Sequence, residues 1–173
     1  LKNALKLIKL AKKSGADAVK IQTYTPDDIT LDIKKPDFII KNKYSPWNKK
    51  TLFKLYEKAH TPLEWHKEIY SYAKKQKIIC FSSVFNERRV DFLEKLGCPA
   101  YKIASFENNH FPLIEKVAAT RKPTIISTGM ARVKEIEEIV KIFKKYKNKN
   151  YALLKCTSAY PSDPKESNLL GIK

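Results

Sequence analysis

The sequence lacks the features that mark membrane-spanning, secreted and zinc-binding proteins. No apolar run approaches the roughly 20 residues of a transmembrane helix, and the first residues have no apolar signal-peptide core. Three cysteines are too few and too scattered for a disulfide framework, and neither a Cys-x-x-Cys pair nor a histidine at zinc-site spacing accompanies them. We therefore expect a cytoplasmic protein with no membrane partner.

Glycine-rich nucleotide-binding motifs are absent as well, and the chain has only four glycines. No Gly-x-Gly-x-x-Gly follows an expected strand, which leaves a dinucleotide-binding fold without support. No Gly-Lys-Ser or Gly-Lys-Thr loop occurs, which excludes a P-loop. The only methionine is Met130, and the chain starts inside an amphipathic helix, so we expect a fragment of a longer protein.

A net charge of +17 would suit a non-catalytic nucleic-acid-binding protein if the basic residues formed one face. The lysines instead recur in pairs on separate expected helices. Only four arginines are present, although arginine is the better reader of phosphates and bases. We therefore expect a solvated lysine-rich surface and no nucleic-acid partner. The positive field would still speed the arrival of a small anionic substrate.

Expected helices and strands alternate along the chain, after a first helix that ends at Gly15. A long loop covers 25–50. Thr51 is the expected N-cap of the next helix, and Thr61-Pro62 is expected to start another. Strands are expected over 19–24, 78–83, 100–106, 124–128 and 151–157, and the further helices over 52–60, 63–76, 87–96, 111–119 and 133–146.

The expected strands are continuous apolar runs, which is typical of a parallel sheet covered on both faces. An open doubly wound sheet gathers its ligand groups at one switch point, whereas a barrel places them at the carboxyl ends of many strands. Every expected strand ends in polar residues such as Ser82-Ser83, so a barrel is favoured. A closed barrel needs eight strands. We therefore predict an α/β fold in which residues 1–173 form one incomplete (β/α)8 TIM barrel, with about strands 2 to 6.

Lys20, Lys102 and Lys155 each interrupt an apolar, β-branched run. Because a lysine is almost never fully buried without a partner, they predict one of three arrangements: a bound anion, ion pairs with core carboxylates, or side chains that point outward. Serines and threonines recur at the same strand ends and can donate hydrogen bonds to phosphate oxygens, which favours the anion. We expect the ammonium groups of Lys20 and Lys102 to point into one shared pocket.

Glu107 is a carboxylate just beyond a strand end. It would bind a sugar hydroxyl or a metal-bound water, or else serve as a helix N-cap or a loop ion pair. Gly129 closes the strand that ends in Ser127, and either lets a ligand approach the backbone or simply makes the turn. His60 and His66 are not at a metal-ligand spacing, and packing or surface roles are expected for both.

Five strand-end motifs in this order resemble those of the sialic acid synthase family and span nearly the whole chain. Within the family, 22–27 and 55–66 are most similar to the branch that makes pseudaminic acid. Val84 and Asn86 depart from the family pattern, which usually has Pro and Asp there. The motifs are Lys20-Ile21-Gln22-Thr23, Phe81-Ser82-Ser83-Val84-Phe85-Asn86, Tyr101-Lys102-Ile103-Ala104-Ser105-Phe106-Glu107, Ser127-Thr128-Gly129-Met130 and Lys155-Cys156-Thr157-Ser158-Ala159-Tyr160-Pro161.

The resemblance implies a transferase that condenses phosphoenolpyruvate with an N-acetylated amino sugar and releases phosphate. For the pseudaminic acid branch the sugar is open-chain 2,4-diacetamido-2,4,6-trideoxy-altrose. Catalytic roles are implied for Glu107 and Lys102, and sugar contacts for Gln22, Glu107 and Tyr160. Phosphoenolpyruvate contacts are implied for Lys20, Ser83, Lys102, Ser105, Ser127 and Ser158.

The resemblance also implies parts that we expect outside this chain: the first strand, the last two strands with two metal-binding histidines, and a C-terminal antifreeze-like domain. The full-length enzyme is expected to be a homodimer that uses a divalent metal (Mn, Mg or Co) held by residues outside 1–173. The chain alone is expected to be inactive and poorly stable, because an open barrel exposes two strand edges. The alternatives are an N-acetylneuraminate or legionaminate synthase, or an aldolase with a Schiff-base lysine.

Overall fold

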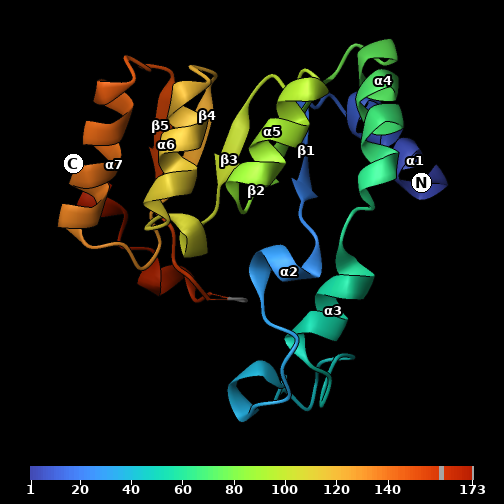
Figure 1. The fold of residues 1–173 in the computed structure, drawn as a ribbon, viewed down its shortest axis with the longest axis vertical. Coiled ribbons are helices and arrows are strands. Elements are labelled where there is room, and N and C mark those ends of the chain that lie inside the picture. Colours follow the sequence, from blue (N-terminus) through green and yellow to red (C-terminus); the bar gives the residue numbers. More distant parts are fainter. Residues whose placement is uncertain (160–161, 173) are drawn as a thin grey trace. The chain divides into compact units, whose positions relative to one another are not determined.

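A computed structural model describes residues 1–159 and 162–172, which form an α/β fold with a five-stranded parallel sheet. The chain divides into two compact units, Leu1–Ile79 and Cys80–Lys173 (Figure 1). Helices and strands alternate strictly through the second unit, whereas in the first unit three α-helices follow the single strand. The prediction of an α/β fold is therefore confirmed, and the alternation holds in the second unit.

The first unit places one strand beside two amphipathic helices. The first and last of its α-helices are in contact, and their apolar faces are buried, with Ile8 4% and Ile69 0% exposed. The segment over 25–50 is irregular apart from two short helical turns, as the sequence predicted. The elements are α1 (Lys2–Lys13), β1 (Ala18–Thr23), α2 (Pro26–Ile29), a 3-10 turn (Pro36–Phe38), α3 (Leu52–Ala59), a 3-10 turn (Leu63–Trp65) and α4 (His66–Lys75).

Two helix starts in this unit were predicted, and one was wrong. Thr51 caps α3 as predicted, because its hydroxyl accepts a hydrogen bond from the Lys54 N–H at 3.3 Å. Thr61 does not start an α-helix. The Pro62 carbonyl accepts bonds from the Trp65 N–H at 3.0 Å and from the His66 ring at 3.1 Å. The first turn is therefore a tighter 3-10 turn, and α4 begins only at His66.

The second unit is a parallel sheet whose strand order follows the chain, β2-β3-β4-β5. A doubly wound sheet would reverse its order at a switch point, so this order is that of a barrel segment. Three helices lie in a row along the strands in the same order (Figure 1). The elements are β2 (Ile79–Val84), α5 (Glu87–Lys95), β3 (Tyr101–Ile103), a 3-10 turn (Ser105–Glu107), α6 (Phe111–Ala119), β4 (Thr124–Ser127), α7 (Val133–Lys145), β5 (Tyr151–Leu154) and 3-10 turns at Pro164–Ser167 and Leu169–Ile172.

The core of the second unit is fully buried. It joins apolar side chains of β3 and β4 to the inner faces of α6 and α7. At the amino ends of the strands, the Tyr101 hydroxyl donates to Glu94, and the same carboxylate accepts from the Lys122 ammonium at 2.6 Å. This packing holds the strands rigidly enough to position groups at their opposite, carboxyl ends. The largest core side chains are Tyr101, Ile103, Leu113, Ile114, Ile126, Ile139 and Phe143.

Two strands are shorter than predicted: β3 ends at Ile103 instead of 106, and β5 ends at Leu154 instead of 157. Within the described part of the chain β5 pairs with β4 alone, so Leu154 stays 41% exposed. The prediction that this strand is covered on both faces was wrong: Ala152, Leu153 and Leu154 are exposed, because a strand is buried only where other elements cover each face of the sheet. Lys155 follows the strand and is exposed, so it does not interrupt a buried run.

Candidate anion-binding site at the carboxyl ends of the strands

Lys102 carries the charge of the candidate site in the second unit. It sits between Tyr101 and Ile103, which are both fully buried on the other face of β3. Its ammonium donates to the Ser127 hydroxyl at 2.6 Å and to the Ile103 carbonyl at 2.5 Å. The lysine is therefore directed along the sheet toward the carboxyl end of β4, where the sequence predicted an anion site.

Strand register places two serines beside Lys102. Ser83 of β2 is its direct partner across the parallel ladder, and Ile125 of β4 is its partner on the other side. Ser127 lies two residues beyond Ile125 and therefore on the same face of the sheet. Ser83 is 2% exposed and Ser127 is 7% exposed. Cation and hydroxyl groups thus share one face of three adjacent strands.

Gly129 lets two further serines approach the same strand end. A Cβ at this position would lie 2.2 Å from the Ser158 hydroxyl oxygen and 2.7 Å from that of Ser105. Both distances are far below van der Waals contact, so only glycine fits between these hydroxyls without a shift. The glycine is thus needed for side-chain packing in the turn, a role that neither interpretation of Gly129 included, and the approach of a ligand to its backbone stays a prediction.

Glu107 ends the 3-10 turn that follows β3. Burial raises its pKa to about 7, although a hydrogen bond to backbone and the charge of Lys102 act in the opposite direction. His110, not Glu107, is the N-cap of α6, so the N-cap interpretation of Glu107 was wrong. Within the described residues, Glu107 Oε2 and Ser158 Oγ are buried and have no hydrogen-bond partner. Buried polar atoms without partners are rare, and a bound ligand would satisfy them.

Asn108 is a buried residue of this site that the sequence interpretation missed. Its side-chain amide donates to the Gly129 carbonyl at 2.9 Å and lies 3.5 Å from the Ser127 carbonyl. Nothing in the run Asn108-Asn109-His110 distinguishes a buried asparagine from an exposed one, and only the fold separates them. The family departure at Asn86 is harmless to local structure, because its side chain still caps α5 by accepting the Arg89 N–H at 3.1 Å.

The remaining predicted residues lie elsewhere. Lys20 and Gln22 are on β1 in the first unit, both are solvent-exposed in part, and burial of the rest of Lys20 lowers the pKa of its ammonium. Because Lys20 and Lys102 belong to different units, their shared pocket stays a prediction. Tyr160 lies outside the described residues.

His66 has the predicted packing role, since it is fully buried and its ring lies 2.9 Å from the Thr23 hydroxyl.

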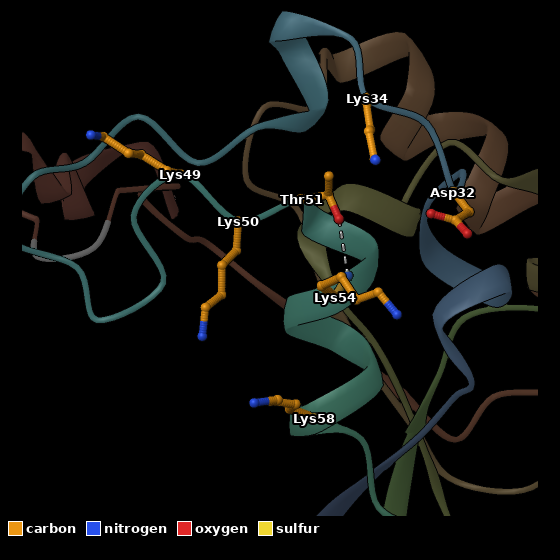
Figure 2. A pocket seen from close by; sticks show the side chains of 7 residues that line it. All are labelled: Asp32, Lys34, Lys49, Lys50, Thr51, Lys54 and Lys58. Carbon is orange, nitrogen blue, oxygen red and sulfur yellow. Dashed lines mark hydrogen bonds between the residues drawn. The ribbon is translucent and has the colours of Figure 1, made fainter.

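A second cationic region lies in the first unit, where lysines dominate the lining of a cavity of about 390 Å³. Figure 2 shows their ammonium groups spread around α3 instead of converging on one point. Lys54 is bonded to Glu57 at 2.9 Å, and this bond, with a smaller contribution from Asp32, raises the pKa of Lys54. The lining residues are Asp32, Lys34, Lys49, Lys50, Thr51, Lys54 and Lys58.

Clusters of metal-binding side chains and membrane-spanning helices are both absent from the described residues. No group of three or more His, Cys, Asp or Glu side chains among them is placed to bind a metal ion. The residues described here therefore do not supply a ligand set for the divalent metal that the family resemblance implies. None of the helices in the described ranges is long and apolar enough to cross a membrane.

Comparison with known proteins supports the resemblance drawn from the strand-end motifs. The model of the NeuB family matches residues 7–173. The chain belongs to the NeuB family. It is 51% identical over 172 residues to pseudaminic acid synthase of Campylobacter jejuni, an alignment that covers 99% of the chain and 50% of the relative. It is 47% identical to pseudaminic acid synthase of Helicobacter pylori, over 93% of the chain and 47% of the relative.

More distant relatives also match nearly the whole chain, in sequence and in structure. The chain is 37% identical to N,N'-diacetyllegionaminic acid synthase of C. jejuni, over 96% of the chain and 50% of the relative. The crystal structure of N-acetylneuraminic acid synthetase from Leptospira borgpetersenii matches with a TM-score of 0.80 and 28% identity, over 98% of the chain and 53% of that structure. The chain therefore spans about half the length of the NeuB relatives that it matches, and a partial barrel fits this coverage.

Proposed function

We propose that this chain forms the phosphoenolpyruvate-binding half of a nonulosonic acid synthase. The single observation that carries the proposal is the cluster at the carboxyl ends of the strands: one directed ammonium group, four serine hydroxyls and the Glu107 carboxyl. Among the described residues, one of these hydroxyls (Ser158 Oγ) and Glu107 Oε2 are buried without a hydrogen-bond partner. Phosphoenolpyruvate is a trianion with many acceptor oxygens. Cations and hydroxyl donors are the groups that bind such a ligand.

The proposed reaction joins phosphoenolpyruvate to an open-chain amino sugar. Carbon 3 of phosphoenolpyruvate attacks the sugar aldehyde and forms the new carbon–carbon bond. Water adds to carbon 2, and the tetrahedral adduct collapses with expulsion of inorganic phosphate. A divalent metal (Mn, Mg or Co), held outside this chain, would supply polarisation of the aldehyde.

The residues of this chain divide by chemistry in the proposal. Lys102, with the serines around it, binds the phosphate and carboxylate oxygens of phosphoenolpyruvate and stabilises the charge that develops on the leaving phosphate. Glu107 has a pKa of about 7, so at neutral pH it is placed both to give and to take a proton at Oε2. The binding set is completed in the proposal by Lys20, Ser83, Ser105, Ser127 and Ser158 for phosphoenolpyruvate and by Gln22, Glu107 and Tyr160 for the sugar.

The sugar in the proposal is 2,4-diacetamido-2,4,6-trideoxy-altrose, and the product is pseudaminic acid. Identity of 51% and 47% to two pseudaminic acid synthases, against 37% to a legionaminic acid synthase, supports this choice. Synthesis of N-acetylneuraminate or legionaminate is the second candidate. Homodimer formation and a cytoplasmic location complete the proposal.

The test uses the protein expressed from its complete reading frame with phosphoenolpyruvate, a divalent metal and each candidate open-chain hexose. Phosphate release followed by ³¹P NMR, together with a product mass equal to the sugar plus the pyruvate unit, is expected only with 2,4-diacetamido-2,4,6-trideoxy-altrose and not with its stereoisomers. Preference for another hexose would replace the sugar assignment. No phosphate release with any hexose would overturn the synthase. Borohydride is expected to trap no sugar on Lys102, and a trapped adduct would point to a Schiff-base aldolase instead.

A further inference from the structure

The turn after β4 is tied to the turn after β3 by one buried side chain, Asn108. This residue is 4% exposed. Its amide nitrogen donates to the Gly129 carbonyl at 2.9 Å and lies 3.5 Å from the Ser127 carbonyl. Because both partners are carbonyl oxygens, which only accept, the NH₂ group of the amide must face them. Asparagine is thus required here by its donor pair as well as by its size.

Both carbonyls belong to residues that shape the candidate site. The Ser127 hydroxyl accepts a hydrogen bond from the Lys102 ammonium at 2.6 Å. Gly129 lies so close to the hydroxyls of Ser105 and Ser158 that a Cβ atom would overlap them. A peptide unit is planar, so fixing the direction of the Gly129 carbonyl also fixes the plane of the Gly129–Met130 peptide. Met130 has a φ of 65°, a conformation uncommon for a residue with a side chain. The Asn108 bond therefore holds a turn that has little intrinsic preference for its shape.

We propose that Asn108 is a positioning residue for anion binding: it holds the turn over 127–130 so that Lys102, Ser105, Ser127 and Ser158 face one ligand. This inference deepens the proposed function and rests on it for the identity of the anion. Asn108 itself touches no ligand in the proposal. It acts through the carbonyls of Ser127 and Gly129.

The chain supplies a matched control, Asn148. Asn148 is also a buried asparagine, at 3% exposed, and its amide also donates to two backbone carbonyls, those of Ala118 at 3.4 Å and Lys122 at 3.1 Å. Lys122 precedes β4, so these bonds lie at the amino end of the strand, opposite to the candidate site. Loss of either asparagine removes the same kind of buried bond, but only Asn108 supports the turn over 127–130.

The experiment compares Asn108→Ala and Asn108→Asp with Asn148→Ala and Asn148→Asp in the protein expressed from its complete reading frame. The alanine variants remove both donors, and the aspartate variants keep the shape but turn an oxygen toward the carbonyls. We expect all four to lower the thermal midpoint comparably. We expect the Asn108 pair to raise the phosphoenolpyruvate KM about tenfold or more, with the sugar KM changed less than twofold. The Asn148 pair is expected to change both constants less than twofold.

A second readout does not depend on the ligand. Backbone amide chemical shifts and hydrogen exchange report on the turn directly, and the Thr128 N–H, bonded to the Leu154 carbonyl at 2.9 Å, is the sensor. Faster exchange at Thr128 and shifted amides over 127–130 are expected in the Asn108 variants and not in the Asn148 variants. If wild-type protein binds no phosphoenolpyruvate but these changes occur, the proposed function fails, and what stands is that Asn108 holds the turn over 127–130.

Two outcomes would overturn the positioning role. One is folded Asn108 variants whose phosphoenolpyruvate KM and Thr128 exchange match wild type. The other is Asn148 variants that lose phosphoenolpyruvate affinity as strongly as the Asn108 variants. This result would show that both residues only stabilise the fold.

Discussion

Two cationic regions of this protein show the difference between a general electrostatic field and a binding site. The cavity beside α3 is lined by five lysines, but they are exposed and their ammonium groups spread around the helix (Figure 2). The strand-end site of the second unit has only Lys102, half-buried, held at 2.6 Å from the Ser127 hydroxyl. Exposed charges are screened by water and salt, whereas a partly buried, oriented charge is not. For anion binding, the burial and orientation of one ammonium group therefore matter more than the number of lysines.

The largest expected effect is that of Lys102→Met, which removes the directed charge and keeps most of the side-chain volume. We expect the Kd for phosphoenolpyruvate to rise by about 100-fold or more, since loss of a charge that pairs with a buried ligand typically costs roughly 2–5 kcal/mol. Isothermal titration calorimetry measures this. The matched control is Lys54→Met in the α3 cavity, for which less than a twofold change is expected. Equal losses in the two variants would remove the distinction between the regions.

The next effect concerns stability and comes from Glu107→Gln. Because the pKa of Glu107 in the folded protein is about 7, above its ordinary value of 4.5, the folded state holds its proton more tightly than the unfolded state does. The wild-type free energy of unfolding should therefore fall as pH rises from about 4.5 to 7. We expect about 2 kcal/mol of this fall to be absent in Glu107→Gln, a figure reduced for the partial exposure of the carboxyl.

Urea denaturation at pH 5 and pH 8 measures this difference. The glutamine variant should match wild type at pH 5 and exceed it at pH 8. Glu137→Gln, at an exposed position of α7, serves as the control and should leave the wild-type pH dependence unchanged. Parallel pH profiles for wild type and Glu107→Gln would show that the carboxyl is not buried in solution.

A smaller effect is expected from Gly129→Ala. The new methyl group would overlap the hydroxyls of Ser158 and Ser105, so these side chains must rotate away from the site. We expect about a tenfold loss of phosphoenolpyruvate affinity, comparable to the loss of one or two hydrogen bonds. In a Ser158→Ala background the added methyl has more room, and its additional effect should be clearly smaller. An unchanged affinity of Gly129→Ala would exclude Ser105 and Ser158 from the binding set.

The smallest expected effect is that of Lys50→Gln with Lys58→Gln in the α3 cavity. These exposed lysines contribute only to the long-range field, so the Kd for phosphoenolpyruvate should change less than twofold at about 0.15 M salt. The association rate at low salt should fall modestly, and stopped-flow measurements over a salt series test this. A large loss of affinity at 0.15 M salt would make the cavity a specific anion site.

The sequence predicted most of the α/β alternation because apolar periodicity and capping residues act locally, as Thr51 does for α3. The contact between Lys102 and Ser127 follows from the predicted parallel strands, which bring their carboxyl ends together, and the binding role of both residues stays a prediction. The sequence interpretation misjudged Lys155, which follows an edge strand. The start of α4 was wrong because the His66 ring and the Trp65 N–H share the Pro62 carbonyl, a choice made by folding.

Local apolar periodicity and the fixed order of the strand-end motifs were enough to predict the order of the elements, the family and the residue types gathered at the strand ends. Three properties depended on the folded structure: Asn108 and Asn148 are buried at opposite ends of β4, Gly129 leaves room for two hydroxyls, and burial raises the pKa of Glu107 to about 7. These properties depend on which groups surround a side chain in space, and burial and close approach between distant segments exist only after folding.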